Sequence, residues 1–174
     1  MKLSARLIIL LTLALPIVSA VCISACDEED DCTLATRAMV YCNLYRLNDA
    51  GTAYIADTLD VLTVKALGTD STIVNAQEDV SDLTLPLRYT SDTTTLVFHY
   101  YETDDEDSTY LSGVRDTLWI FHTNTPYFLS MDCGYQMKQY IESVTYSRHQ
   151  LDSISLIDEE ANIYGTENLR LYFQ

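Results

Sequence analysis

A run of acidic residues is the first feature of this sequence that could do chemistry. Residues 102–107 (E-T-D-D-E-D) carry five carboxylates between two predicted strands. Ca²⁺ takes six to eight oxygen ligands, and one loop can supply several of them. The run has no internal Gly and no D-x-D-x-D-G pattern, so we expect a solvated loop, with a calcium site as the alternative.

The three histidines are dispersed along the chain. His99 and His122 fall in neighbouring predicted strands and His149 in a later turn, without the H-x-H or H-E-x-x-H spacing of metal sites. The sequence contains no G-x-S-x-G motif and no P-loop. A Ser–His–Asp set assembled by folding is the open alternative. We therefore predict a protein that is not an enzyme and has no metal site and no cofactor.

Residues 1–25 predict a secretory signal. Lys2 and Arg6 precede an almost wholly apolar stretch, Leu7–Ala20, whose 14 residues are fewer than the number that spans a bilayer as a helix, about 20. Residues 23–26 (I-S-A-C) resemble the lipobox of bacterial lipoproteins. We therefore expect cleavage before Cys26 and diacylglycerol on its thiol. The alternative is an ordinary secretory cleavage that leaves this cysteine as a thiol or in a disulfide.

Five consecutive acidic residues follow the predicted lipidation site: Asp27, Glu28, Glu29, Asp30 and Asp31. Like charges at this density repel each other and do not pack, so residues 26–35 predict a solvated tether between the lipid and the fold. Acidic runs at this place also resemble the surface-export signal of Bacteroidota lipoproteins. A sorting role is therefore the alternative interpretation.

Three cysteines remain after signal cleavage and lipidation: Cys32, Cys42 and Cys133. Export favours oxidation, and three thiols allow one disulfide. Cys42 lies on the apolar face of a predicted strand, where a free thiol behaves as a small hydrophobe. We therefore expect a Cys32–Cys133 bridge, with Cys42–Cys133 or no bridge as the alternatives. No C-x-x-C pattern indicates a zinc or thioredoxin-like site.

The elements that must position these residues are predicted to be strands, because short runs rich in Val, Ile, Thr, Tyr and Phe recur and no amphipathic helix is found. The predicted strands are 36–47, 58–67, 80–89, 93–101, 117–123, 135–146, 151–157 and 169–173. Pro86 indicates an edge or bulged strand. Residues 36–174 thus predict one all-β domain, an antiparallel β-sandwich, immunoglobulin-like or related, of about seven to nine strands.

Six Asp-Ser or Asp-Thr pairs are followed by Leu, Ile or Thr, which resembles the O-glycosylation sequon of Bacteroidota secreted proteins. The candidate acceptors are Thr58, Ser71, Thr93, Ser108, Thr117 and Ser153. An Asp before a strand also opens a turn by accepting from N–H groups two residues on, which we expect for Asp57, Asp92, Asp116 and Asp152. Both interpretations stay open.

Thirteen tyrosines are a high number for this length. Five of them could form an exposed aromatic surface: Tyr100, Tyr101, Tyr127, Tyr135 and Tyr140. Aromatic rings stack on sugars and anchor protein interfaces. The favoured interpretation, however, is that they fill half-buried strand positions, which suit Tyr.

Motifs spread over the predicted mature chain resemble a family of small, uncharacterised Bacteroidota lipoproteins with a β-sandwich-like domain. The motifs are Cys26 with its acidic tail, Cys32, residues 133–135 (C-G-Y), 141–146 (I-E-S-V-T-Y), 151–154 (L-D-S-I) and 168–173 (N-L-R-L-Y-F). The resemblance implies a lipid anchor and a fold, and it implies no activity.

The formal net charge of −16 argues against nucleic acid as a partner, because phosphate binding needs clustered Lys and Arg, and we predict no nucleic-acid partner. We expect a non-enzymatic lipoprotein held in the outer membrane by its lipid, at the cell surface or the periplasmic face. Its predicted role is an accessory or interaction subunit that binds another envelope protein. The alternative is a carbohydrate-binding surface lipoprotein of a glycan-uptake system.

Overall fold

The computed structural model describes residues 37–69, 71–103, 109–131 and 133–174, all within one compact unit of the chain. These residues form strands, turns and irregular segments without a helix, so none of them forms a helix able to cross a membrane. The strands are β1 (Val40–Leu47), β2 (Tyr54–Ala56), β3 (Leu59–Ala66), β4 (Thr72–Val80), β5 (Asp82–Leu85), β6 (Thr93–Thr103), β7 (Thr109–Ser130), β8 (Gly134–Tyr146), β9 (Leu151–Leu156) and β10 (Glu167–Phe173).

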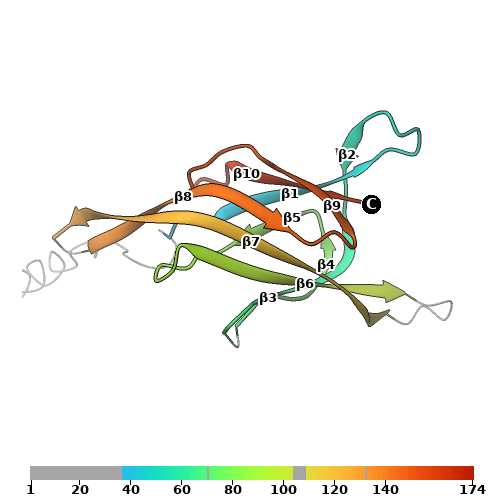
Figure 1. Ribbon diagram of the computed structural model, residues 1–174, viewed down its shortest axis with the longest axis horizontal. Helices are drawn as coiled ribbons and strands as arrows, with labels where there is room; N and C mark the ends of the chain where they lie inside the picture. The colour runs from blue at the N-terminus through green and yellow to red at the C-terminus, as the bar shows by residue number, and fades with distance from the viewer. Residues whose placement is uncertain (1–36, 70, 104–108, 132) are drawn as a thin grey trace, which may run out of the picture. The chain divides into compact units, whose positions relative to one another are not determined.

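Two five-stranded sheets pack against each other (Figure 1). One has the order β2-β1-β10-β9, with β5 paired to β1, and the other has the order β4-β3-β6-β7-β8. The predicted all-β sandwich is confirmed. Its strands pair antiparallel except β1 and β10, which run parallel.

The core between the sheets follows from the alternation of apolar residues along the strands. In β1 the alternating residues Val40, Cys42 and Leu44 are buried, and β10 buries Leu169, Leu171 and Phe173 on the same side. The facing sheet contributes Phe98 and its alternating neighbours in β6 and β7. Burying each such side chain stabilises the fold by about 1.5–3 kcal/mol.

The strand boundaries differ from the predicted ones in identifiable places. The described part has ten strands, whereas the sequence predicted eight. The two additional strands, β2 and β4, were missed because they carry too little apolar alternation to be recognised; all of β2 is exposed. β4 is mostly exposed and contains Ala76 and Asp79 at positive φ. The strand predicted at 80–89 ends before Pro86, which has no N–H to donate.

β7 extends well beyond the predicted Thr117–Thr123 in both directions. Its pairing with β6 ends at Phe121, whereas its pairing with β8 continues from Thr123↔Tyr140 to Ser130↔Gly134. This two-stranded extension, residues 123–130 and 134–140, is called the arm below. It continues past the end of β6, as Figure 1 shows on the left.

Candidate functional site

Asp116 lies within β7 and is 1% exposed, although its position before a predicted strand suggested a turn. Its carboxylate accepts hydrogen bonds of 2.9 Å from the three consecutive backbone N–H groups of residues 149–151. The hydroxyls of Ser147 (2.8 Å) and Tyr100 (3.1 Å) donate to it as well. The turn expectation is therefore wrong at this position: the carboxylate fastens the distant β8–β9 turn onto β7.

The electrostatics at this carboxylate are those of a structural group. Burial opposes its charge, but the backbone and Ser147 hydrogen bonds outweigh burial and hold the pKa of Asp116 below its ordinary value. Burial first, and then the neighbouring carboxylate, raises the pKa of Tyr100. Ser147 Oγ and His149 Nδ1 both contact Asp116 Oδ1, at 2.8 and 3.1 Å. In a catalytic triad the imidazole stands between the other two groups, so this arrangement does not activate Ser147.

The other histidines lie apart from this carboxylate. His122 is buried, its Nε2 is 2.9 Å from the Thr94 hydroxyl, and burial lowers its pKa. His99 is half-buried, and burial together with nearby basic groups lowers its pKa too. Within the described ranges no group of three or more His, Cys, Asp and Glu residues is placed to hold a metal ion.

The base of the arm is fixed by buried amides. The fully buried Gln139 side chain donates to Asn124 Oδ1 (2.7 Å) and to the carbonyl oxygen of Arg88 (3.2 Å). Asn124 in turn donates to the carbonyl oxygen of Ser91 (2.8 Å). These bonds join the arm to the β5–β6 connection and set the direction in which the arm leaves the sandwich.

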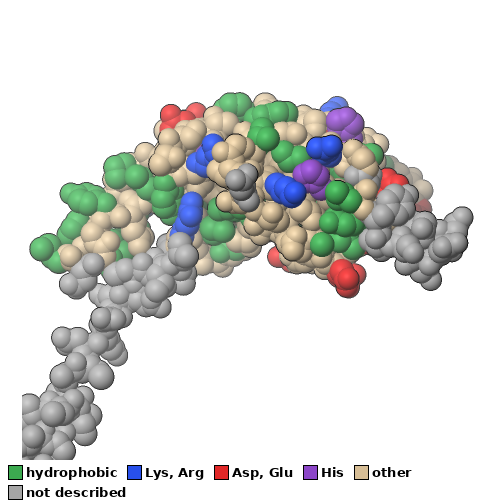
Figure 2. Space-filling view, turned by 90° about the horizontal axis from the view of Figure 1, so that it is seen from below, with side chains coloured by type: hydrophobic (Ala, Val, Ile, Leu, Met, Phe, Trp, Pro, Cys, Tyr) green, Lys and Arg blue, Asp and Glu red, His purple; other side chains and the backbone are tan. Residues whose placement is uncertain are grey.

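Beyond this base the arm exposes large apolar side chains. Phe128 is 52% exposed, Tyr135 75% and Met131, in the turn between the strands, 89%. The rings of Phe128 and Tyr135 meet edge to face with centroids 5.5 Å apart. Figure 2 shows hydrophobic side chains gathered at this end of the β7–β8 ribbon. Phe128, Met131 and Tyr135 are called the arm tip below.

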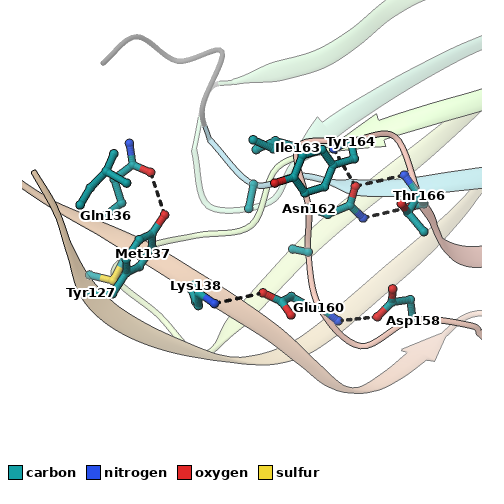
Figure 3. A pocket seen from close by; sticks show the side chains of 13 residues that line it. Tyr127, Gln136, Met137, Lys138, Asp158, Glu160, Asn162, Ile163, Tyr164 and Thr166 are labelled. Carbon is teal, nitrogen blue, oxygen red and sulfur yellow. Dashed lines mark hydrogen bonds and ion pairs between the residues drawn. The ribbon is translucent and has the colours of Figure 1, made fainter. Parts of the chain in front are cut away.

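A cleft of about 490 Å³ lies beside the arm, between β7 and β8 on one side and the β9–β10 loop on the other (Figure 3). It is called the arm cleft below. Its apolar lining includes Tyr127, Leu129 and Met137 from the arm and Ile163 and Tyr164 from the loop. Exposed apolar side chains next to a concave surface are typical of interaction sites.

Three charged side chains line the arm cleft: Lys138, Asp158 and Glu160. Lys138 Nζ lies 3.6 Å from Glu160 Oε1 and 5.8 Å from the centre of the Tyr127 ring, and Asp158 accepts from the backbone N–H of Glu160. Cation–π and surface ion pairs of this kind are weak, so they contribute little to stability. No nucleophile with an adjacent base lines this cleft.

Asn162 shapes the loop on the far side of the arm cleft. Its Oδ1 accepts from the N–H groups of Tyr164 and Thr166, both at 3.0 Å, and its Nδ2 donates to the Thr166 carbonyl at 2.9 Å. These bonds close residues 162–166 into a tight loop (Figure 3). Ile163 remains 45% exposed and Tyr164 84% exposed, so the loop presents two apolar side chains to solvent.

The structure separates the five tyrosines proposed as one surface. Tyr100 is buried against Asp116, so it cannot belong to an exposed aromatic surface. Tyr127 and Tyr135 lie on the arm, and Tyr101 and Tyr140 are half-buried. The sequence interpretation missed four exposed apolar residues: Phe128, Met131, Ile163 and Tyr164. The sequence did contain an indication, because apolar residues in segments that were predicted to contain no strand are candidates for an exposed surface.

A second group of tyrosines lies on the β2-β1-β10-β9 sheet. Tyr172 contacts Tyr54, with ring centroids 4.3 Å apart, and Tyr45, at 5.7 Å. Glu167 accepts hydrogen bonds from the Tyr45 hydroxyl and from Arg170 Nε. Burial opposes the charge of Glu167, but these bonds and one from Asn43 lower its pKa.

The cysteines divide as follows. Cys42 is buried and free, and burial raises the pKa of its thiol. Cys133, at the arm turn, is disulfide-bonded. A Cys42–Cys133 bridge, one of the alternatives, is thereby excluded. The predicted partner Cys32 lies outside the described residues, so the pairing stays a prediction.

The glycosylation candidates occupy different environments. Thr58 and Ser71 are exposed, whereas Thr93, Thr117 and Ser153 are half-buried strand residues. Ser108 lies outside the described residues, as do Cys26, the acids at 27–31 and most of the acidic loop at 102–107.

Comparison with known proteins gives a family without an activity. Residues 61–173 match a family described as a family of unknown function (DUF6452). No curated protein and no solved structure matches the chain. The matched range contains the arm and the whole β9–β10 loop of the arm cleft.

Proposed function

The chain belongs to the DUF6452 family, and we propose that it is a non-enzymatic, lipid-anchored protein of the outer membrane that binds another envelope protein. The observation that carries the proposal is the arm cleft, with Tyr164 84% exposed at its rim. Aromatic side chains that fill pockets dominate the energetics of protein interfaces. The hydrogen bonds of the Asp116 and Glu167 carboxylates to groups of the fold support the non-enzymatic part of the proposal.

The N-terminal sequence supports the anchor. Cys26 in its lipobox-like context would carry the lipid, and several acyl chains on one cysteine give stable membrane attachment. The acidic residues that follow would form the tether or an export signal. We include the Cys32–Cys133 disulfide in this proposal, together with O-glycosylation at one or both exposed acceptors, Thr58 and Ser71.

The test is a mild-detergent purification of the full chain from native membranes, followed by mass spectrometry of what accompanies it. We expect one envelope protein in fixed stoichiometry. The double substitution Ile163→Ser and Tyr164→Ser should abolish its recovery and leave the melting temperature unchanged, because both side chains are exposed. The control is Leu67→Ser, a 54% exposed apolar residue in the β3–β4 turn whose substitution should keep the partner.

Two results would contradict the proposal. A chain that is purified alone, with native lipidation confirmed by its mass, would remove the accessory-subunit function. A partner that the double variant retains as well as the control does would show that the arm cleft is not the contact.

The second candidate function, binding of a surface glycan, is favoured by the Tyr45–Tyr54–Tyr172 group. Sugar rings stack on exposed aromatic faces, and Tyr54, in contact with Tyr172, is 50% exposed. Tyr45 of the same group lies beside the polar groups of Glu167 and Arg170. Affinity for a polysaccharide that falls on Tyr54→Ala, but not on Tyr164→Ala, would support it. Equal binding by both variants would exclude this face.

A further inference from the structure

The arm tip differs in charge from the rest of the chain. From Thr123 to Tyr140 the sequence contains one acid, Asp132, and one base, Lys138, whereas the whole chain has a net charge of −16. The three side chains of the tip are apolar or aromatic and half or more exposed. A neutral, aromatic end of an acidic protein is the part that can approach a lipid surface without electrostatic repulsion.

The proposed Cys32–Cys133 disulfide would tie this end to the residues that follow the anchor. Cys133 is disulfide-bonded and Cys42 is free. Cys32, the partner proposed above, follows Cys26 by six residues. Because an extended chain spans at most about 3.5 Å per residue, this pairing would hold the arm turn within roughly 20 Å of Cys26 along the chain.

The start of the described domain gives a second constraint. Arg37 follows Cys26 by eleven residues, a reach of at most about 40 Å. Ala38, the next residue, lines the arm cleft, and Met39 bridges to Asn162 in its loop. The described chain therefore begins beside the arm, and the proposed disulfide would lead to the same end of the domain.

We infer that the arm tip docks into the lipid bilayer beside the anchor, with Phe128, Met131 and Tyr135 in the interfacial layer. The inference rests on the proposed lipid anchor at Cys26. The tip supplies the apolar and aromatic side chains that bury about 5–10 Å into such an interface, and the two connections hold it there. Docking would fix the orientation of the domain and hold the arm cleft close to the membrane surface.

The experiment uses the lipidated full chain in phosphatidylcholine vesicles, with and without bromine on the acyl chains. Met131→Trp places a fluorophore at the tip, and the matched control Leu111→Trp places one at an exposed position near the other end of β7. Trp119, the single native tryptophan, is a constant background measured in the unsubstituted protein. Vesicle flotation reports the anchor independently of the fluorescence.

We expect the emission of Met131→Trp to shift to the blue and to fall by roughly half or more in brominated vesicles, while Leu111→Trp is unaffected. Adding Cys133→Ser should weaken the quenching, because it removes one connection. Flotation without quenching at the tip would overturn the docking and leave the anchor intact. Quenching of both positions alike would overturn it as well, since the contact would not be specific to the arm. Failure to float would refute the anchor and the docking together.

Discussion

Two regions of β7 use their side chains in opposite ways. Within the first half of the strand, Asp116 is almost fully buried and surrounded by hydrogen-bond donors. In the arm, Phe128 and Leu129 are about half exposed. The ionisable group, Asp116, thus stabilises the fold, and the apolar side chains of Phe128 and Leu129 form the exposed surface.

This contrast is the physical reason for the binding function proposed above. A buried carboxylate that is fully hydrogen-bonded stabilises one arrangement of the chain and offers nothing to a substrate. Apolar side chains left in water gain free energy when something covers them. The predictions below test whether the Asp116 region serves stability and the arm region serves binding.

The largest effect is expected for Asp116→Asn. The amide lacks the charge and one acceptor oxygen, so several donors lose their partner, and we expect a loss of about 3 kcal/mol in the free energy of unfolding. Chemical denaturation measures this loss. The folded fraction should still recover the partner protein. A stable Asn variant that loses the partner would contradict the account, because it would show that partner binding depends on the Asp116 region and not on the arm cleft alone.

Cys42→Ser comes next. Cys42 is 1% exposed within the apolar core, and a hydroxyl there exchanges a small hydrophobe for a polar group, which costs about 1–3 kcal/mol. The same denaturation experiment measures it, with Cys42→Ala as the control for lost volume. A Ser variant as stable as the Ala variant would mean that the core tolerates polar groups without hydrogen-bond partners. The hydrogen bonds of Asp116 would then not be needed for stability.

Acidification should remove the stability that Asp116 contributes to the fold. Because the pKa of Asp116 in the folded chain lies below its ordinary value of 3.8, its contribution is complete above that value and is lost as the pH falls through the lowered pKa. Melting curves at decreasing pH should therefore decline more steeply for the native chain than for Asp116→Asn. Parallel declines would assign the acid sensitivity to other carboxylates.

The smallest effect is expected for Lys138→Met in the arm cleft. Its ion pair with Glu160 is about half exposed, and such pairs contribute roughly 0–1 kcal/mol. We expect a melting temperature within the error of the native value. A clear destabilisation would show that the charged pair in the cleft, like Asp116, stabilises the fold.

The sequence predicts the sandwich well because its core strands alternate regularly, as in Val40, Cys42 and Leu44. It fails at β4, where most side chains are exposed and no alternation marks the strand. Asp116 was assigned to a turn because local sequence does not reveal bonds to residues 149–151, more than thirty positions away.

The arm cleft could not be predicted for a related reason. It forms where Tyr127 and Met137 of one hairpin meet Ile163 and Tyr164 of a distant loop, and only the folded register brings them together. The apolar content of both segments was visible, but their adjacency depends on the bridges Met39↔Asn162 and Tyr140↔Glu160.

The most direct test of the account is site-specific photocrosslinking in native cells, with a photoreactive amino acid in place of Tyr164 or Leu111. Both positions are exposed, one at the rim of the arm cleft and one near the opposite end of β7. The account predicts a discrete crosslinked species with one envelope protein from position 164 and none from position 111. Crosslinks from position 111 alone, or equal crosslinks from both, would contradict it.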